Sequence, residues 1–412
     1  MLKRTFKYRI FPTKAQVDLL NGQLSESCRL YNAALQERRD AWRLERKSIS
    51  LYDQTYQLKE ILNEGHSEIK GFSAAWHVLD RVNKAFAAFF SRVKKKQKAG
   101  FPRFKSHTRF DSFEWQVLPT SNPLVTGKLR IPQLGLFKIK LHRPIEGKIK
   151  HASVKREGGK WYACLSVEIE AKPLPESKES VGVDVGLKAF AVLSDGTGID
   201  NPRYYKEAQA KLRRAQRKVA RRKKGGNGRR KAVQLLQRAH RYVFNQRVDF
   251  HHKESRKLVN RYGLIAVESL NIKGLASGIL AKSITDAGWG SFLDKIAYKA
   301  EEAGRQFFRV NPSGTSQICS GCGQKEKKTL AERVHNCAAC GLVLDRDHNA
   351  AINILGAGKA LAGSTWEDAP SVPAEEPSPQ APVRKRRKKS SHEAGACGFL
   401  FDMTPPLEVE GV

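Results

Sequence analysis

Four cysteines have the spacing of a metal site. Cys319 and Cys322 form one CxxC pair, Cys337 and Cys340 form a second, and fourteen residues separate the two pairs. Each CxxC turn can present two thiolates to one ion, so the two pairs complete the tetrahedron that zinc prefers. The spacing predicts a zinc ribbon, and two disulfides or free thiols are the alternative. Because four protein ligands leave no open position for a substrate, we expect a structural role for the ion.

Three carboxylates are the candidate catalytic residues. Asp184 lies within a short apolar strand segment, Glu268 ends a second such segment, and Asp347 opens the last helical segment. Each has an ordinary explanation when taken alone: an acid at a strand edge, a cap, or an acid favoured by the helix dipole. Asp345 competes with Asp347 for the third position, and we prefer Asp347 because it directly precedes the helix. Asn349 either supports a metal shell or caps that helix.

The order of these carboxylates along the chain adds to the argument. The order resembles the RNase H arrangement, in which three carboxylates meet at one sheet edge. The first is in the first strand of a hairpin, the second is at the end of a later strand, and the third opens the final helix. Clustered carboxylates repel one another, so they need divalent cations to stay ionised together. Two Mg²⁺ ions about 3.5–4 Å apart would hold the attacking and leaving oxygens of a phosphodiester. The order therefore predicts a Mg²⁺-dependent nuclease.

The charge of the chain favours a nucleic-acid partner. The 412 residues contain 75 Lys and Arg against 41 Asp and Glu, a formal net charge of +34. Such an excess repels itself unless a polyanion neutralises it, so nucleic acid is the first candidate and a membrane surface the second. The sequence has no apolar run of 18 or more residues, which excludes a spanning helix. Without a signal-peptide pattern, and with CxxC pairs that suit a reducing compartment, we expect a cytoplasmic protein.

Hydrophobic periodicity divides the first half of the chain into β and helical segments. Residues 1–10 alternate like a strand that ends at residues 11–13, and residues 14–98 follow a helical pattern. Residues 112–171 alternate with period two and contain the hairpin turn Gly158–Gly159. These patterns predict a β domain that a helical domain interrupts.

The second half alternates short strands with helices. Residues 203–256 hold 19 Lys or Arg against three acids and are interrupted by the glycine-rich residues 225–228, which predicts a basic helical hairpin. Beyond about residue 363 the composition predicts disorder, and the basic run 384–389 is expected to bind nucleic acid or, alternatively, to act as an import-like sequence. The expected strands are 181–186, 189–193, 264–268 and 307–310, and the expected further helices are 291–303 and 347–361.

Several segments carry a resemblance to a known family. The chain resembles TnpB, the OrfB-type protein of bacterial insertion sequences, which is related to the type V CRISPR effector nucleases. The resemblance covers about residues 3–356, in order. The segments that carry it are 8–13, 31–32, 100–105, 182–186, 267–270, 283–289, 319–323 and 345–351.

The resemblance implies an α/β fold class. The implied protein has an RNase H-like (RuvC-like) nuclease domain with an inserted zinc ribbon. It also has an N-terminal β-barrel-like wedge domain that a helical recognition domain interrupts. The implied boundaries are 1–12 and 101–175 for the wedge domain, 13–100 for the recognition domain, 180–315 and 342–362 for the nuclease domain, 316–341 for the zinc ribbon and 363–412 for a disordered basic tail.

The resemblance also implies an RNA-guided DNA endonuclease of a bacterial insertion sequence. Its catalytic triad falls on Asp184, Glu268 and Asp347, and its zinc ligands fall on the four cysteines. The implied cofactors are structural Zn²⁺, catalytic Mg²⁺ and a guide RNA from the transposon end. The expected partner is double-stranded target DNA. We expect one protein chain in each RNA complex, located in the bacterial cytoplasm and associated with the nucleoid through nucleic acid. Two alternatives are a guided DNA-binding repressor without catalysis and a transposase that joins DNA ends.

Basic side chains are expected to bind the phosphates of RNA and DNA without reading sequence. Phe101 and Phe104 either stack on RNA or, as we prefer, lie in the core. The residues expected to bind nucleic acid are Lys95, Lys96, Arg103, Arg213, Arg214, Arg217, Arg221, Arg222, Lys223 and Lys224.

Overall fold

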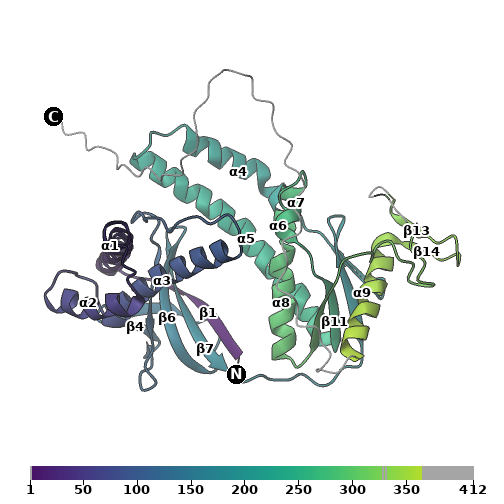
Figure 1. Cartoon of the computed structure of the whole chain (residues 1–412), viewed down its shortest axis with the longest axis horizontal. Coiled ribbons are helices and arrows are strands. Elements are labelled where there is room, and N and C mark those ends of the chain that lie inside the picture. Colours follow the sequence, from purple (N-terminus) through teal and green to yellow (C-terminus); the bar gives the residue numbers. More distant parts are fainter. Residues whose placement is uncertain (1, 327–328, 330–331, 364–412) are drawn as a thin grey trace. The chain divides into compact units, whose positions relative to one another are not determined.

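The computed structural model describes residues 2–326, 329 and 332–363 (Figure 1). The expected basic tail, with its run at 384–389, lies outside these residues. No helix in the described ranges combines the length and apolar character needed to cross a membrane. The buried apolar side chains gather in two main cores, one among residues 6–169 and one among residues 181–303.

Seven antiparallel strands organise the first core, in the order β2-β6-β7-β1-β5-β4-β3. β1 (Leu2–Ile10) pairs along its whole length with β7 (Lys160–Ile169), whose alternate residues are buried, so the predicted period of two is confirmed. Gly158 and Gly159 form the predicted turn before β7, both with positive φ, a conformation that glycine adopts without strain. The other strands are β2 (Ser112–Gln116), β3 (Leu124–Val125), β4 (Lys128–Ile131), β5 (Gly135–Lys140) and β6 (Lys148–Glu157).

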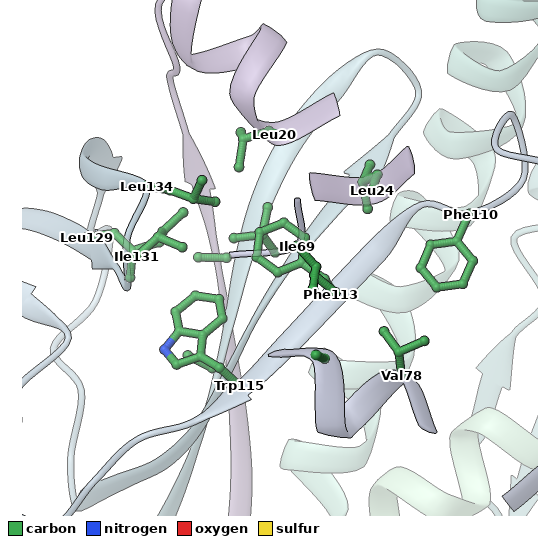
Figure 2. Packing of buried hydrophobic residues seen from close by; sticks show 14 of the residues in the cluster. Leu20, Leu24, Ile69, Val78, Phe110, Phe113, Trp115, Leu129, Ile131 and Leu134 are labelled. Carbon is green, nitrogen blue, oxygen red and sulfur yellow. The ribbon is translucent and has the colours of Figure 1, made fainter. Parts of the chain in front are cut away.

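Three helices stand between β1 and β2 in the chain: α1 (Lys14–Glu45), α2 (Leu51–Asn63) and α3 (Phe72–Lys94). Thr13 starts α1 with a reciprocal capping box to Gln16. The predicted helical pattern is confirmed, although non-helical segments at 46–50 and 64–71 divide it. Figure 2 shows part of the core that these helices share with the sheet, which contains Leu20, Leu24, Ile69, Val78, Phe110, Phe113, Trp115, Leu129, Ile131 and Leu134.

The second sheet has five strands in the order β10-β9-β8-β11-β12. β8 (Ser180–Val185), β11 (Leu264–Glu268) and β12 (Gln306–Val310) are parallel, and β9 (Ala189–Leu193) and β10 (Gly198–Asp200) are antiparallel to their neighbours. Parallel strands need long crossover connections, and helices supply them here. All four strands predicted for this region are confirmed, with small differences at their ends.

A pair of long helices forms the connection from β10 to β11. α4 (Tyr204–Ala220) and α5 (Asn227–Arg261) pack side by side, joined by residues 221–226 (Figure 1). This basic hairpin (residues 204–261) confirms the predicted helix pair, but its turn comes earlier than predicted, because residues 227 and 228 already belong to α5. The connection from β11 to β12 contains α6 (Ile272–Leu275), α7 (Ala281–Ala287) and α8 (Trp289–Glu302).

The last helix, α9 (Arg346–Gly363), packs against β8, β11 and β12. Two glycines allow this close packing. A Cβ added at Gly182 of β8 would lie 2.0 Å from the carbonyl oxygen of Ala351, and one at Gly358 would lie 2.4 Å from the Cβ of Ala266. Any larger residue would therefore push α9 away from the sheet.

Residues 318–345, which we call the cysteine module, connect β12 to α9. Two short antiparallel strands, β13 (Val334–Asn336) and β14 (Val343–Asp345), follow the first CxxC turn and frame the second. β14 runs directly into α9. The module therefore connects the last strand of the sheet to the helix that carries Asp347.

Candidate functional site

The four cysteines form a compact sulfur cluster. Their Sγ atoms all lie within 4.8 Å of one another, and two pairs, Cys319 with Cys340 and Cys322 with Cys337, are 3.6 Å apart. This spacing is far longer than a disulfide bond of about 2.05 Å. It is close to the edge of about 3.8 Å that a sulfur tetrahedron has around zinc when each Zn–S distance is about 2.3 Å. Donors and spacing both fit a zinc ion held by four thiolates.

The two CxxC turns share one backbone pattern. In each, the first cysteine, Cys319 or Cys337, donates its N–H to the carbonyl five residues later and accepts the N–H four residues later, all at 2.9 Å. Burial opposes ionisation of Cys319, but hydrogen bonds, chiefly from the backbone of Cys322 and the side chain of His335, bring its pKa down to about 5. Thiolate is the form that binds metals, so the hydrogen bonds that lower the pKa of Cys319 favour metal binding.

Asp184 and Glu268 lie on neighbouring parallel strands. Val183 of β8 pairs with Val267 of β11, so the next residue on each strand is a carboxylate at the same end of the sheet. Equivalent positions on parallel strands point to the same face. Both carboxylates are half-buried. The sheet register thus brings together two acids that are far apart in the sequence.

Asp347 comes to the same end of the sheet on α9. The helix lies directly against β8 at Gly182, and a Cβ added at Gly186 would lie 4.0 Å from Oδ2 of Asp347. Asp347 is half-buried. Because α9 begins at residue 346, Asp347 stands in its first turn, where the helix dipole stabilises negative charge.

The pKa of Asp184 is affected by both of the other carboxylates. Burial raises the pKa of Asp184 well above its usual range, and the neighbouring Glu268 and Asp347 raise it further. Burial also raises the pKa of Glu268, while a hydrogen bond from Thr315 acts in the opposite direction. Their oxygens are not as close together as the sulfurs: among the described residues, only the cysteines bring three or more ligand atoms within 4.8 Å of one another.

The neighbouring acid, Asp345, has a different role. Its Oδ1 accepts the backbone N–H of Asp347 at 2.9 Å, and its residue is exposed. It thus satisfies a free N–H at the start of α9. This arrangement favours Asp347 over Asp345 as the third acid, as the sequence argument preferred.

Asn349 does not cap α9, because it lies within the helix. It is completely buried and binds the first CxxC turn: its Nδ2 donates to the carbonyl of Ile318 at 2.8 Å, and its Oδ1 accepts the N–H of Ser320 at 2.9 Å. Sequence reasoning missed Thr315 and Asn353. Thr315, just before the module, binds Glu268, and Asn353 of α9 binds the carbonyls of Thr315 and of Ile318 in the module. Nothing in the local sequence marks these contacts, because they depend on how α9 lies against the module.

The basic hairpin presents a dense row of exposed cations. The seven predicted residues in and beside its turn, which lie between 213 and 224, are all exposed. Within the described residues, none of the seven has a carboxylate within 4.0 Å. Unpaired exposed cations at this density favour binding to a polyanion.

The N-terminal basic cluster is also exposed. Lys95, Lys96 and Arg103 lie on the surface after α3. The preferred expectation that Phe101 and Phe104 lie in the core is wrong, because each is 46% exposed. The rings of Phe86 and Phe89 cover only part of Phe101, each with its centroid 5.5 Å away. The two exposed rings keep open the alternative, stacking on RNA.

Three family comparisons match different parts of the chain. Residues 164–277 match OrfB_IS605, described as a probable transposase, and residues 289–354 match the Cas12f1-like TNB domain. Residues 1–47 match the helix-turn-helix domain named HTH_OrfB_IS605. In this structure the described part of that last region holds the strand β1 and the single helix α1.

Sequence relatives cover most of the chain. A protein of Streptomyces pristinaespiralis named "Putative RNA-guided DNA endonuclease" is 32% identical over 88% of this chain and 90% of its own length. A protein of Escherichia coli K12 named "Putative RNA-guided DNA endonuclease InsQ" is 31% identical over 69% of this chain and 73% of its own.

A solved structure shares the fold. The protein in a cryo-EM structure of a Cas12f1–sgRNA–target DNA complex is 14% identical in sequence and superposes with a TM-score of 0.57. The match covers 86% of this chain and 98% of that one. The likeness therefore extends over both halves of the described chain.

Proposed function

This chain belongs to the TnpB family, and from that membership we propose that it is an RNA-guided DNA endonuclease of a bacterial insertion sequence. The observation that carries the proposal is the meeting of Asp184, Glu268 and Asp347 at one end of the second sheet. Relatives of similar length carry the name of such an endonuclease. A protein that only binds DNA has no need for three acids in one place.

The nuclease domain in this proposal is RuvC-like. The strand order β10-β9-β8-β11-β12, with the first three strands antiparallel and the last two parallel to β8, supports this assignment. It is the arrangement expected of an RNase H-like sheet, with one acid on the central strand, one on its parallel neighbour and one on the helix that covers both.

The carboxylates would act as metal ligands. Two Mg²⁺ ions at this site would activate water and stabilise the departing 3′ oxygen of the phosphodiester. Asp184 stands between the other two acids and is the natural shared ligand, since both influence it. Burial and the two neighbouring acids raise its pKa, so three uncompensated negative charges are unfavourable here, and divalent cations held by these residues would offset the repulsion.

The cysteine module would hold a structural zinc ion. Cys319, Cys322, Cys337 and Cys340 use all four positions of a tetrahedron, so no position remains for water or substrate. The ion would keep the two CxxC turns together beside α9.

Guide RNA and double-stranded target DNA would bind the exposed cations. The basic hairpin, with Lys95, Lys96 and Arg103, would contact phosphates and leave sequence reading to base pairing. We propose that the RNA-bound protein acts as a monomer in the bacterial cytoplasm, at the nucleoid.

The test begins with the RNA. The protein is co-expressed with the native DNA that flanks its gene, purified, and its bound RNA is sequenced. We expect a discrete RNA whose 3′ end extends beyond the element. The complex is then given matching target DNA and Mg²⁺. Cutting that disappears in Asp184→Ala, with RNA binding unchanged, would support the proposal.

Other results would favour the alternatives. A complex that binds its target tightly but never cuts with Mg²⁺ present would indicate a guided repressor. New DNA junctions formed from donor DNA without any RNA would indicate a strand-transferring transposase. Undiminished cutting by Asp184→Ala would remove the assigned acids from the mechanism.

A further inference from the structure

Glu268 has a single side-chain hydrogen-bond partner in the described residues. The hydroxyl of Thr315 donates to its Oε1 at 2.5 Å. Thr315 is only 8% exposed, so little water competes for this hydrogen bond. Its hydroxyl also lies 3.2 Å from the carbonyl of Pro312, but the one hydroxyl proton serves the shorter contact to the carboxylate best.

Helix α9 fixes the backbone around Thr315. The Nδ2 of Asn353 donates to the carbonyl of Thr315 at 2.8 Å and to that of Ile318 at 2.7 Å. One turn earlier on the helix, Asn349 holds the carbonyl of Ile318 and the N–H of Ser320. The segment 315–320, which contains the first zinc-ligand candidate, is therefore held by two side-chain amides of one helix.

The same helix carries the third acid. Asp347 stands two residues before Asn349 on α9, so the helix that brings Asp347 to the site also fixes the residue that binds Glu268. We propose that Thr315 is a positioning residue for Glu268, held in place by Asn353 and by the first CxxC turn. The inference deepens the proposed endonuclease and rests on it for its catalytic meaning.

The chemical effect concerns one carboxylate oxygen. With Oε1 occupied by the hydroxyl, Oε2 is free to face a cation, and the side chain is restricted in rotation. A glutamate has three side-chain torsions, and ordering such a side chain costs conformational entropy. Thr315 pre-orders Glu268 before the metal arrives, as a hydrogen-bonding partner outside the ligand shell does in metal sites.

The test compares variants of the RNA-bound protein. Thr315→Val removes the hydroxyl and keeps the branched shape, and Thr315→Ser keeps the hydroxyl. Ser313→Ala, an exposed hydroxyl in the same loop, is the matched control. Mn²⁺ binding is measured by electron paramagnetic resonance, and target cutting is measured against Mg²⁺ concentration. Zinc content and thermal unfolding are recorded for each variant.

We expect Thr315→Val to weaken Mn²⁺ binding and to raise the Mg²⁺ concentration for half-maximal cutting, each by roughly tenfold or more. High Mg²⁺ should restore much of the rate, and Thr315→Ser and Ser313→Ala should resemble the parent. A merely structural threonine would lower the melting temperature without changing the Mg²⁺ dependence. Equal Mn²⁺ affinity and equal Mg²⁺ dependence in parent and Thr315→Val would overturn the inference.

Two further outcomes separate the possible failures. If Thr315→Val does not fold, Thr315→Ala takes its place in the same titrations, and failure of both to fold would assign Thr315 a structural role and overturn the proposal. If the parent never cuts but Thr315→Val still weakens Mn²⁺ binding, the endonuclease proposal fails while the positioning role stands.

Discussion

The cysteine module and the carboxylate site lie at the same end of α9 and are built in opposite ways. The four sulfurs come from one short stretch of chain and lie within 4.8 Å of one another. The three carboxylates come from β8, β11 and α9, and burial and mutual repulsion raise the pKa of Asp184. One site is a compact cluster made by local turns, and the other is an open cluster made by tertiary structure.

Under the proposed function, this difference separates a site that would stabilise the fold from a site that would carry the reaction. The sulfur cluster uses every ligand position for the protein, which suits a permanent ion. The carboxylate cluster is only partly exposed, and its oxygens are not all taken up by protein partners, which suits exchange of metal, water and substrate. The four predictions below test the contrast, beginning with the largest expected effect.

The sharpest test uses two neighbouring acids. We expect Asp347→Asn to reduce target cutting by at least about a thousandfold, the scale of losing a catalytic group. Asp345→Asn should keep most of the activity, because Asp345 is exposed and binds the backbone of α9. Cutting rates of the two RNA complexes at saturating Mg²⁺ decide between them. If Asp345→Asn is the inactive variant, our assignment of the third acid is wrong.

Removing zinc ligands should unfold the module. A structural zinc ion contributes on the order of 10 kcal/mol to folding in small zinc domains. We therefore expect the double variant Cys337→Ser and Cys340→Ser to lose zinc, measured by mass spectrometry, and to lose cutting as the support for Glu268 and α9 fails. Cys164→Ser, at a half-buried thiol of β7 outside the cluster, is the control and should keep both. Full cutting without zinc would show that the two sites are independent.

Neutralising part of the basic hairpin should moderately weaken RNA binding. Replacing Arg213, Arg214, Arg217 and Arg221 with Gln should weaken RNA binding and reduce the slope of log affinity against log salt by about 0.7 for each lost phosphate contact. Cutting per bound complex should change little, because these residues are not in the carboxylate site. Titrations at several salt concentrations measure the slope.

The control removes the same charge from paired cations. It replaces four cations that already bind acids, namely Arg29, Arg43, Lys84 and Lys172. If this control variant loses as much affinity and slope as the hairpin variant, RNA responds to net charge and the hairpin is not its specific site.

The smallest expected effect is a pH-dependent change in the melting temperature when Asp184 is replaced. Because the pKa of Asp184 is raised in the folded protein, its contribution to stability is fully present below the unfolded pKa and is lost as pH rises through the folded pKa. At neutral pH without added Mg²⁺, and without a chelator that would remove zinc, Asp184→Asn should raise the melting temperature. The gain should shrink at acidic pH and in Mg²⁺. A gain that does not vary with pH would contradict an electrostatic origin.

The two sites also differ in how far they could be predicted. The cysteine cluster could be predicted because its geometry follows from the spacing of the two CxxC pairs within one segment. The strands that carry Asp184 and Glu268 could be predicted from their apolar patterns. The pairing register of β8 with β11, which brings the two acids together, could not. The hydrogen bonds of Thr315, Asn349 and Asn353 depend on the position of α9, which no local pattern encodes. The exposure of Phe101 and Phe104 was missed because it also depends on tertiary packing, here beside α3, and not on the local sequence pattern.

The close approach at Gly182 has a consequence for biosynthesis. The ribosome completes β8, β11 and the basic hairpin before it makes α9, the helix that packs on Gly182 and carries the third acid. Under the proposed function, a nascent chain would bind RNA on its finished hairpin while its three acids are still incomplete. Translation order would then separate RNA binding from cutting, and a chain that terminates before α9 would bind RNA without the third acid.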